Sequence, residues 1–421
     1  MSEWKRYKLS ELYEMSSGIS STKEQAGHGS PFLSFSVVFN NYFLPDSLID
    51  LMDTTDGDKQ KYSINEGDIF LTRTSETVDE LAMSSVALKD YPEASFSGFL
   101  KRLRPVDKTI VYPKFMAFYL RSPLFRRTII NNTVMTLRAS FNEAMFSYLE
   151  IMLPDFDTQK KIGNFLYSLE KKKQINNQIN QELEAMAKTL YDYWFVQFDF
   201  PDQNGKPYKS SGGKMVYNQE LKREIPEGWG VTKLNEVVDL ISGYPFSSKD
   251  YVTSGKYKLY TIKNVQDGYT VDKVDNYLDF LPSNMSHECQ LRRGDLIMSL
   301  TGNVGRVGMV YEDDVLLNQR VLKLNPFNKT HKSFIYSFFR SDVTKVHLEN
   351  MSTGTSQKNL SPIDIGNMMI PFPSESLLSK FLDNLNMLEN NLVENQQLTQ
   401  LRDWLLPMLM NGQVKVEDFI I

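Results

Sequence analysis

The chain has 421 residues, of which 41% are hydrophobic and 24% charged, the ordinary composition of a globular protein with material for about two or three domains. It contains no apolar run of about 18 residues and no apolar segment behind its first charged residues, so we expect neither a transmembrane helix nor a secretory signal. Cys289 is the only cysteine, which excludes a disulfide within the chain and favours a cytoplasmic protein. A net charge of −5 argues against a uniformly basic nucleic-acid-binding surface but allows local basic patches.

The sequence contains an internal repeat. The segment WKRYKLSELYEMSSG begins at Trp4, and the similar segment WGVTKLNEVVDLISG begins at Trp229. Three further matches follow in the same order: EGDIFLTRT with RGDLIMSLT, LEIMLPDFD with GNMMIPFPS, and IGNFLYSLE with LSKFLDNLN. Matches in one constant order indicate a duplication, in which each half repeats the same structural unit.

The two halves share one organisation. Each begins with a mixed part, in which short apolar runs bounded by Gly and Asp indicate strands and longer segments indicate helices. A long helix follows, and a segment rich in Gly, Pro, Ser and charged residues joins the halves. We therefore predict an α+β fold with an internal pseudo-two-fold repeat, with globular domains at 1–153 and 229–372, long helices at 154–198 and 373–412, a connector at 199–228 and a tail at 413–421.

Both long helices carry an apolar stripe with coiled-coil spacing. In the first helix one series falls seven residues apart and a companion series follows three residues behind it, with Asn176 as a polar position that would help to fix the register. In the second helix the apolar stripe continues through Leu398, Leu401 and Leu405, and its spacing slips by one residue after Asn395, so we expect local overwinding there. The residues assigned to this helix spacer are Ile162, Phe165, Leu169, Asn176, Ile179, Leu183, Met186 and Leu190 in the first helix and Phe381, Leu385, Leu388, Leu392 and Leu398 in the second.

The stripes allow two interpretations. A helix packed on its own domain is the usual explanation of a single amphipathic stripe. Two stripes at duplicated positions favour the alternative, in which the helices pair antiparallel about the pseudo-two-fold axis and bury one another. Two similar domains with a rigid helical spacer suit a linear target with two parts, and double-stranded DNA is the obvious candidate.

Several segments resemble the specificity subunit of type I restriction-modification enzymes. The segment from Asp192 to Trp229, which begins DYWFVQFDFP, and the C-terminal LRDWLLPMLMNGQVKV resemble conserved segments of that family. The segment from Pro154 through QKKIGNFL resembles the start of its central helix, while SLTGNVGRVGMVY and STGTSQKNLS resemble parts of its target-recognition domains. The resemblance covers nearly the whole chain and departs near Ser379, where the family usually has Gln.

The resemblance implies how such a chain works. The two globular domains would be target-recognition domains, each reading half of a bipartite DNA sequence, and the long helices would act as a ruler between the half-sites. The resemblance also implies docking of two methyltransferase (modification) subunits and of restriction/translocase subunits. Those partners would hold S-adenosylmethionine, ATP and magnesium, and this chain would hold no cofactor.

The sequence offers little for catalysis by the chain itself. It has no Pro-Pro dipeptide, which the base-holding loop of a DNA amino-methyltransferase needs, and YKSSGGKM lacks both the first Gly and the final Ser or Thr of a phosphate-binding loop. None of the four histidines stands at metal-ligand spacing from Cys289. We therefore predict no catalytic and no metal-binding residues. Two rivals stay open: a single-chain restriction enzyme or nuclease with an unrecognised active site, and a protein-binding scaffold that keeps the fold.

Basic residues gather in two runs of this acidic chain. Nine stand against one acidic residue from Lys101 to Arg138, and six against one from Arg320 to Lys345. A solvated helix face usually explains such a run, but its recurrence in both repeats favours contacts with DNA phosphates, which provide affinity without sequence information. The residues assigned to DNA on this ground are Lys101, Arg102, Arg104, Arg126, Arg127, Arg138 and Arg320.

Sequence-specific reading needs side chains that match base edges, chiefly Arg for guanine and Asn or Gln for adenine. Short polar loops at duplicated positions offer such groups, although each loop alone would be interpreted as a solvent-exposed turn. The residues assigned to base readout are Arg73, Thr74, Arg138, Ser140 and Asn142 in the first half, and Thr301, Asn303, Arg306, Ser356, Gln357, Lys358 and Asn359 in the second.

Overall fold

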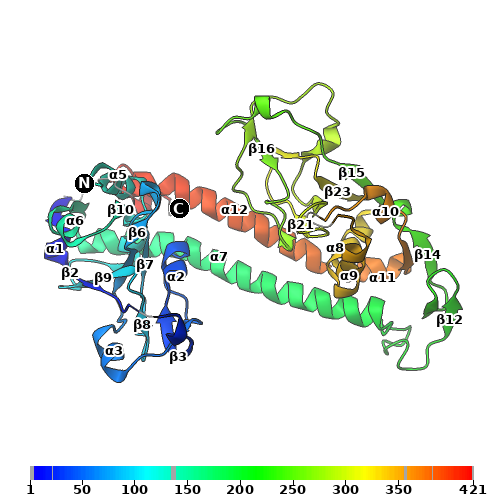
Figure 1. Cartoon of the computed structure of the whole chain (residues 1–421), viewed down its shortest axis with the longest axis horizontal. Coiled ribbons are helices and arrows are strands. Elements are labelled where there is room, and N and C mark those ends of the chain that lie inside the picture. The colour runs from blue at the N-terminus through cyan, green and yellow to red at the C-terminus, as the bar shows by residue number, and fades with distance from the viewer. Residues whose placement is uncertain (1–3, 21, 134–138, 355–357, 382, 420–421) are drawn as a thin grey trace. The chain divides into compact units, whose positions relative to one another are not determined.

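The computed structural model describes residues 4–20, 22–133, 139–354, 358–381 and 383–419. The chain forms two compact units, here called the first unit (Met1–Lys172 with Leu398–Ile421) and the second unit (Lys173–Gln397). Each unit contains one of the predicted mixed domains together with segments of both long helices (Figure 1). Within the described residues, no helix combines the length and apolar character that a membrane span requires.

A four-stranded antiparallel sheet forms the centre of the first unit, in the strand order β2-β9-β5-β7. Its apolar strand β5 is buried along its whole length because helices and a second sheet cover it. The strands of this unit are β1 (Lys5–Lys8), β2 (Tyr13–Ser17), β3 (Ala26–Leu33), β4 (Leu51–Met52), β5 (Ile69–Thr72), β6 (Thr74–Ser75), β7 (Ser84–Val86), β8 (Ser95–Phe96), β9 (Leu100–Pro105), β10 (Ala139–Ser140) and β11 (Glu150–Leu153). The helices are α1 (Leu9–Leu12), α2 (Phe35–Asn40), α3 (Asp56–Lys61), α4 (Pro113–Tyr119), α5 (Pro123–Asn131), α6 (Glu143–Tyr148) and the first part of α7 (Phe156–Tyr191).

The second unit repeats this plan with one more strand, in the order β15-β23-β20-β21-β17. A second sheet has the order β18-β16-β22-β19. The strands are β12 (Met215–Asn218), β13 (Arg223–Pro226), β14 (Gly230–Lys233), β15 (Val238–Ser242), β16 (Tyr257–Tyr260), β17 (Gly268–Tyr269), β18 (Tyr277–Leu278), β19 (Gln290–Leu291), β20 (Leu296–Ser299), β21 (Val307–Met309), β22 (Val315–Leu317), β23 (Val321–Pro326) and β24 (Met369–Phe372). The helices are the second part of α7, α8 (Lys332–Arg340), α9 (Asp342–Met351), α10 (Pro362–Gly366), α11 (Glu375–Phe381) and the first part of α12 (Asp383–Met410).

The Gly-Asp pair that the two halves share has the same structural role in both units. Gly67 and Gly294 adopt positive φ angles of 92° and 85°, which favour glycine in the turn before β5 and β20. The following Asp68 and Asp295 carboxylates accept the backbone N–H three residues earlier at 2.8 Å in each unit. Each carboxylate also pairs with a basic residue on the neighbouring strand, β9 or β23. The predicted α+β fold and its internal repeat are confirmed.

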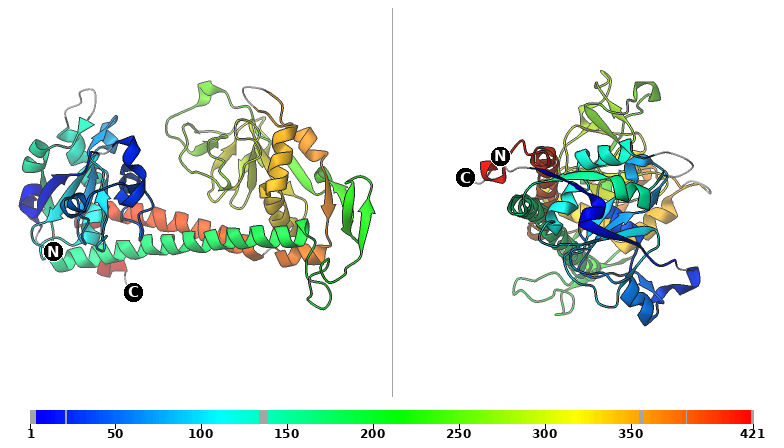
Figure 2. Two further views of the ribbon diagram at one scale, coloured as in Figure 1. Left: turned by 60° about the horizontal axis from the view of Figure 1, so that its bottom comes forward. Right: turned by 90° about the vertical axis from the view of Figure 1, so that its left-hand side faces the viewer.

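The helices α7 and α12 run antiparallel within each unit, as the views in Figures 1 and 2 show. In the second unit the Asn176 amide donates to Glu394 Oε2 at 2.7 Å and to Asn395 Oδ1 at 3.0 Å. Farther along α7, Asn180 Oδ1 accepts from Asn391 Nδ2 at 2.9 Å. Rising numbers on α7 therefore meet falling numbers on α12, and the polar position Asn176 lies in the seam, as predicted.

The predicted companion series on α7 is wrong by one residue. Ile179 is 39% exposed and Met186 51%, whereas Asn180 is 8% exposed. The buried companion positions lie four residues after the main series, not three, because the helix turns its small and polar residues toward α12. Ile179 and Met186 are apolar but exposed, and they placed the predicted series on the wrong face of the helix.

The predicted slip in the second helix does not occur. Leu401, which marked the slip, is 40% exposed, and the next residue, Arg402, is 8% exposed. With Arg402 in the seam, the alternation of three and four residues continues from Asn395 to Leu409, which is fully buried. The apolar spacing failed here because a buried seam position carries a charge.

The end of α7 passes into the connector through a five-residue π-helix, Asp192–Val196. A group of aromatic rings packs around this point: the ring centroids of Phe195 and Phe198 lie 6.1 Å and 5.4 Å from that of Trp229, the residue that opens the second repeat. The antiparallel pair β12–β13 follows in the chain. Aromatic contacts therefore join the end of α7 to the start of the second repeat within the second unit.

Candidate nucleic-acid interface

Of the basic residues assigned to DNA phosphates, two are buried in the first unit and a third is partly buried. Lys101 is 3% exposed, and its Nζ contacts Glu143 Oε1 at 2.6 Å and Ser17 Oγ at 2.9 Å. Arg102 is also buried, donates to the Ser63 carbonyl oxygen at 2.6 Å, and has a pKa that burial lowers.

Arg104 pairs with the buried Asp68 through Nε at 2.8 Å and Nη2 at 2.6 Å. This hydrogen-bonded pair raises the pKa of Arg104. The assignment of Lys101, Arg102 and Arg104 to phosphates does not hold, because their charged groups already have partners within the fold.

The other basic candidates differ in accessibility. Arg126 on α5 is half-buried, donates to the Asp79 carbonyl oxygen at 2.8 Å, and has its pKa lowered by burial. Arg127 and Arg320 are exposed, and Arg138 lies outside the described residues. Arg127 and Arg320 therefore remain predictions for DNA contact, while the count of nine basic residues overstates the positive surface.

The second basic run is also partly internal. Lys323 is buried on β23 between Glu288 Oε2 at 3.0 Å and Asp295 Oδ2 at 3.1 Å. Arg340 and Lys345 both contact Asp267, at 2.8 Å and 3.0 Å. Burial alone would raise the pKa of the Asp267 carboxyl, but these two cations hold it below its ordinary value.

The structure brings together the polar loops that the sequence offered for base readout. In the first unit β6 pairs with β10, so that Thr74 lies opposite Ser140, and the Arg73 carbonyl oxygen accepts from Phe141 N at 2.8 Å. Far apart in sequence, these candidates form one surface feature. We call the paired segments Arg73–Ser75 and Ala139–Phe141 the first polar edge.

The second unit builds the same feature. Thr301 and Asn359 form a β-bridge, and the Leu300 carbonyl oxygen accepts from Leu360 N at 2.9 Å. We call the paired segments Leu300–Gly302 and Lys358–Leu360 the second polar edge. Ser356 and Gln357 lie outside the described residues. The structure thus places candidates from two distant loops side by side at equivalent positions in both units.

Asn303 and Arg306, which were also assigned to base readout, line a hollow beside the second polar edge together with Gln266 and Tyr269. Asn303 and Lys358 are exposed there, and Arg306 Nη1 donates to Gln266 Oε1 at 3.2 Å. Gln266 and Tyr269 were not predicted from the sequence, because they reach this hollow only through the pairing of β17 with β21. Asn142 serves the fold instead: its Oδ1 accepts from Met145 N at 2.9 Å and caps α6.

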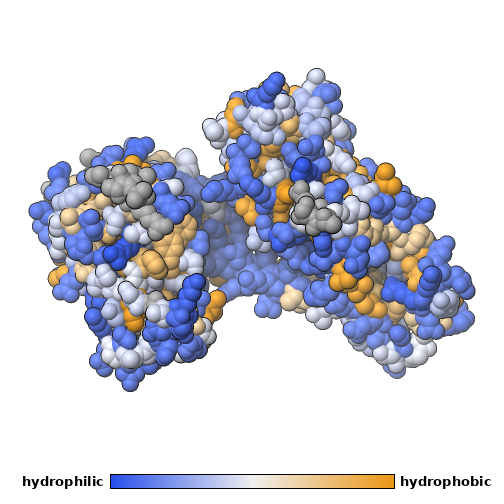
Figure 3. Space-filling view, viewed as in Figure 1, coloured by the Kyte–Doolittle hydropathy of each residue, from blue (hydrophilic) through white to orange (hydrophobic). Residues whose placement is uncertain are grey.

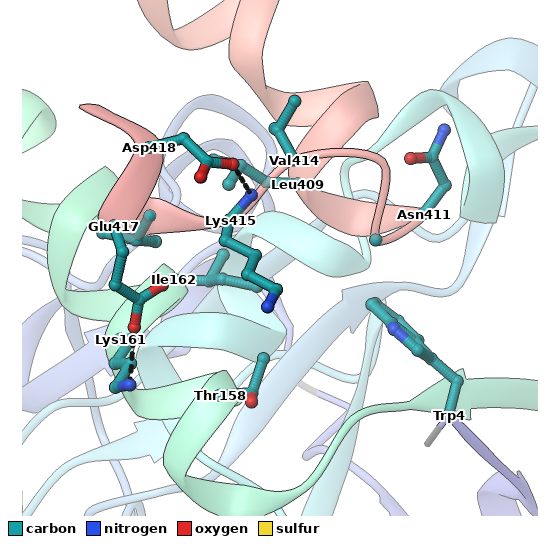
Figure 4. A pocket seen from close by; sticks show the side chains of 12 residues that line it. Trp4, Thr158, Lys161, Ile162, Leu409, Asn411, Val414, Lys415, Glu417 and Asp418 are labelled. Atoms are coloured by element: carbon teal, nitrogen blue, oxygen red, sulfur yellow. Dashed lines mark hydrogen bonds and ion pairs between the residues drawn. The ribbon is translucent and has the colours of Figure 1, made fainter. Parts of the chain in front are cut away.

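The surface seen in Figure 3 is predominantly hydrophilic, with hydrophobic residues scattered among polar ones. A separate hollow in the first unit lies where the tail meets α7 (Figure 4). Lys161 Nζ contacts Glu417 Oε1 there at 2.5 Å, and Trp4 faces the turn at Gly412. These contacts fasten the tail to the first unit.

The described part of the chain offers few side chains suited to metal binding or nucleophilic catalysis. It contains no cluster of three or more His, Cys, Asp or Glu residues arranged to hold a metal ion. The Cys289 thiol is buried, and burial raises its pKa, so that little thiolate is present at neutral pH. The polar edges offer hydrogen-bonding side chains on an accessible surface, which suits recognition of a polar ligand.

Comparison with known proteins decides the family. Residues 1–185 and 226–402 match the family described as "Type I restriction modification DNA specificity domain", so that one family accounts for both repeats. The chain belongs to this DNA specificity family. Its membership explains why two domains with the same strand order and the same Gly-Asp turns occur in one chain.

Named relatives and a solved structure agree with that membership. The chain is 23% identical to the type I restriction enzyme HindI specificity subunit of Haemophilus influenzae, over 98% of this chain and all of that protein. It is 26% identical to the MjaIX specificity subunit of Methanocaldococcus jannaschii, over 64% of this chain and 62% of that protein. The crystal structure of an S subunit from M. genitalium shares the fold with a TM-score of 0.54 at 15% identity, covering 97% of this chain and 96% of that one.

Proposed function

We propose that this chain is the DNA-reading subunit of a type I restriction-modification system and has no catalytic activity of its own. Each mixed domain reads one half of a bipartite sequence in double-stranded DNA through its polar edge. The observation that carries the proposal is the recurrence of these edges: Thr74 with Ser140 and Thr301 with Asn359 occupy equivalent places in the two repeats.

Affinity and specificity come from different groups in this proposal. Exposed basic residues such as Arg127 neutralise phosphates, and this contribution weakens as salt concentration rises. The polar edges supply side chains that form hydrogen bonds with base edges in the major groove. The buried Lys101 and Arg102 and the partly buried Arg104 contribute only to folding.

The long helices set the gap between the half-sites. They suit this role because α7 has 36 residues, α12 has 28, and both belong to both units. Two methyltransferase subunits dock on the repeated surfaces, and restriction/translocase subunits join them in the cytoplasm. Those partners supply S-adenosylmethionine, ATP and magnesium.

The test is the methylated sequence motif of cells that express this chain with its methyltransferase. A bipartite motif that disappears when this chain is omitted supports the proposal. As a second arm, the purified chain alone is incubated with DNA, Mg²⁺, ATP and S-adenosylmethionine. Cleavage or methyl transfer by the chain alone would contradict the proposal and favour a single-chain enzyme.

A further inference from the structure

A short turn next to each polar edge presents a different side chain from the same place in the two domains. In the first unit Leu100 N donates to the Ser97 carbonyl oxygen at 2.9 Å, and in the second unit Val321 N donates to that of Asn318 at 2.9 Å. The residue just before β9 is Phe99, and the residue just before β23 is Arg320. Phe99 is 66% exposed, and Arg320 is exposed as well.

Each turn is joined to its polar edge by the same hydrogen bond. The Phe99 carbonyl oxygen accepts from Arg73 N at 2.9 Å. The Arg320 carbonyl oxygen accepts from Leu300 N at 3.0 Å. Arg73 and Leu300 in turn accept from the second segment of their own edge. The turn and both segments of the edge therefore form one hydrogen-bonded group of backbones in each unit.

Each turn is also fixed from its other side by the glycine of the repeated Ser-Gly motif. A Cβ atom on Gly18 would lie 2.2 Å from the Ser97 carbonyl oxygen, and one on Gly243 would lie 2.0 Å from that of Asn318. Only glycine allows this approach of two backbones. Phe99 and Arg320 thus extend from a backbone that is held on two sides, which is the arrangement a precise contact requires.

The surroundings of Arg320 point to a polar ligand. Arg320, Gln319, Thr301 and Asn359 line one hollow. Thr301 is only 8% exposed, and its Oγ1 has no hydrogen-bond partner in the described part of the chain. A buried hydroxyl without a partner is costly unless a ligand or water supplies one. The Arg320 guanidinium likewise has no ion-pair or hydrogen-bond partner among the described residues.

We propose that Phe99 and Arg320 are equivalent specificity-determining residues, one for each half-site; this inference rests on the proposed function. Arg320 donates to O6 and N7 of a guanine in the major groove, with Thr301 beside it. Phe99 makes an apolar contact with the 5-methyl group of a thymine. Both kinds of contact are established ways to read a base edge.

The exchange of an arginine for a phenylalanine argues against a phosphate contact at this position. A phosphate needs a cation or a hydrogen-bond donor, and a phenyl ring supplies neither. Base edges, in contrast, present both hydrogen-bond acceptors and a methyl group in the major groove. A position that reads bases therefore accommodates both side chains, and the difference between them changes the base that is read.

The experiment uses the full-length chain co-expressed with its methyltransferase, and the readout is the methylated motif in genomic DNA. Arg320→Ala is expected to relax one position of one half-site by about 5- to 150-fold in discrimination, equivalent to about 1–3 kcal/mol, and to leave the other half-site intact. Phe99→Ala is expected to relax a thymine position in the other half-site. Phe99→Arg is expected to convert that preference to guanine.

Two control variants match these substitutions. Phe327, at the opposite end of β23, is 65% exposed and provides the control Phe327→Ala. Arg292, an exposed arginine in the turn before β20, provides Arg292→Ala. Both are expected to leave the motif unchanged, and thermal unfolding checks that all variants fold.

An unchanged motif in folded Phe99→Ala and Arg320→Ala complexes would overturn the inference. Equal weakening on every DNA sequence, or loss of methyltransferase binding by Phe99→Ala, would overturn it as well. The proposed function fails in a different way, through the absence of a bipartite motif in the wild-type complex. The two failures are therefore distinguishable in one data set.

Discussion

Arg402 of α12 lies buried in the seam and donates from Nη1 to Glu170 Oε2 of α7 at 3.0 Å. Its guanidinium also lies 5.0 Å from the centre of the Tyr42 ring, and it contacts its neighbour Asp403. Burial alone would lower the pKa of Arg402, but Tyr42 and these carboxylates raise it. A charged residue thus occupies the seam at a place where the leucine spacing had assigned Leu401.

Exchanging Arg402 therefore tests the observed helix register. Arg402→Ala removes a buried guanidinium together with its ion pair to Glu170 and its contact with the Tyr42 ring, and we expect a loss of about 3–5 kcal/mol in the free energy of unfolding. Leu401→Ala is the matched control and should change stability by less than about 1 kcal/mol, because Leu401 is largely exposed. Chemical denaturation of the full chain measures both. A larger loss for Leu401→Ala would restore the register expected from the leucines.

Asn176 offers a second test of the seam, in the second unit. Asn176→Ala removes the donor to Glu394 and Asn395 and should cost about 1–3 kcal/mol. Gln178→Ala, an exposed substitution two residues away, should change stability by less than about 0.5 kcal/mol. Equal midpoints for the two variants in thermal unfolding would show that the Asn176 hydrogen bonds contribute nothing measurable.

The seam also shows what the sequence could and could not predict. The repeat, the α+β class and the long helices followed from matching motifs and periodic apolar residues. The phase of the seam did not, because Asn180 and Arg402 take buried positions while Ile179 and Leu401 face water. Periodicity arguments count apolar residues, so they miss a polar residue that is buried with its partner.

Prediction of the DNA-binding residues from sequence was limited for a similar reason. Charge counting cannot separate an arginine that is paired with a buried carboxylate from one that is free on the surface, and so it included Arg104. It also gave no hint that Thr74 meets Ser140, because that pairing depends on how distant segments fold. Phe99 was missed for a different reason: an exposed aromatic residue in a turn has no sequence signature of its own.

The different roles of the basic residues predict different responses to substitution. Arg104→Ala leaves the buried Asp68 carboxylate without its ion-pair partner, so we expect about 3–5 kcal/mol of destabilisation. The salt dependence of DNA binding should stay unchanged for the folded fraction. Arg127→Ala should leave stability unchanged and lower the slope of log affinity against log salt by about 1. Binding titrations of the assembled complex at several salt concentrations test both, and a reduced slope for Arg104→Ala would contradict its structural role.

Burial of Cys289 predicts slow thiol chemistry. Because burial raises the pKa of this thiol, the folded chain contains less thiolate than a free cysteine at the same pH. At pH 8, labelling by a disulfide reagent should be slow in the native chain and fast in denaturant. The thiolate fraction of Cys289 should rise with pH in both states, and in the native state the rise should occur at a higher pH than in denaturant. Rapid labelling of the native chain at pH 8 would contradict the buried position.

We propose that two equivalent domains read two half-sites and that the paired helices fix the gap between them. The most direct test inserts seven residues after Lys172 in α7 and seven after Gln397 in α12, at the boundary between the units. A full heptad keeps the seam in phase and lengthens each helix by roughly 10 Å, or about three base pairs of DNA. The measurement is the methylated motif of this variant in complex with its methyltransferase. If the helices set the gap, the variant should methylate the same two half-sites with a gap wider by about three base pairs. An unchanged gap in an active variant would show that the helices do not set it.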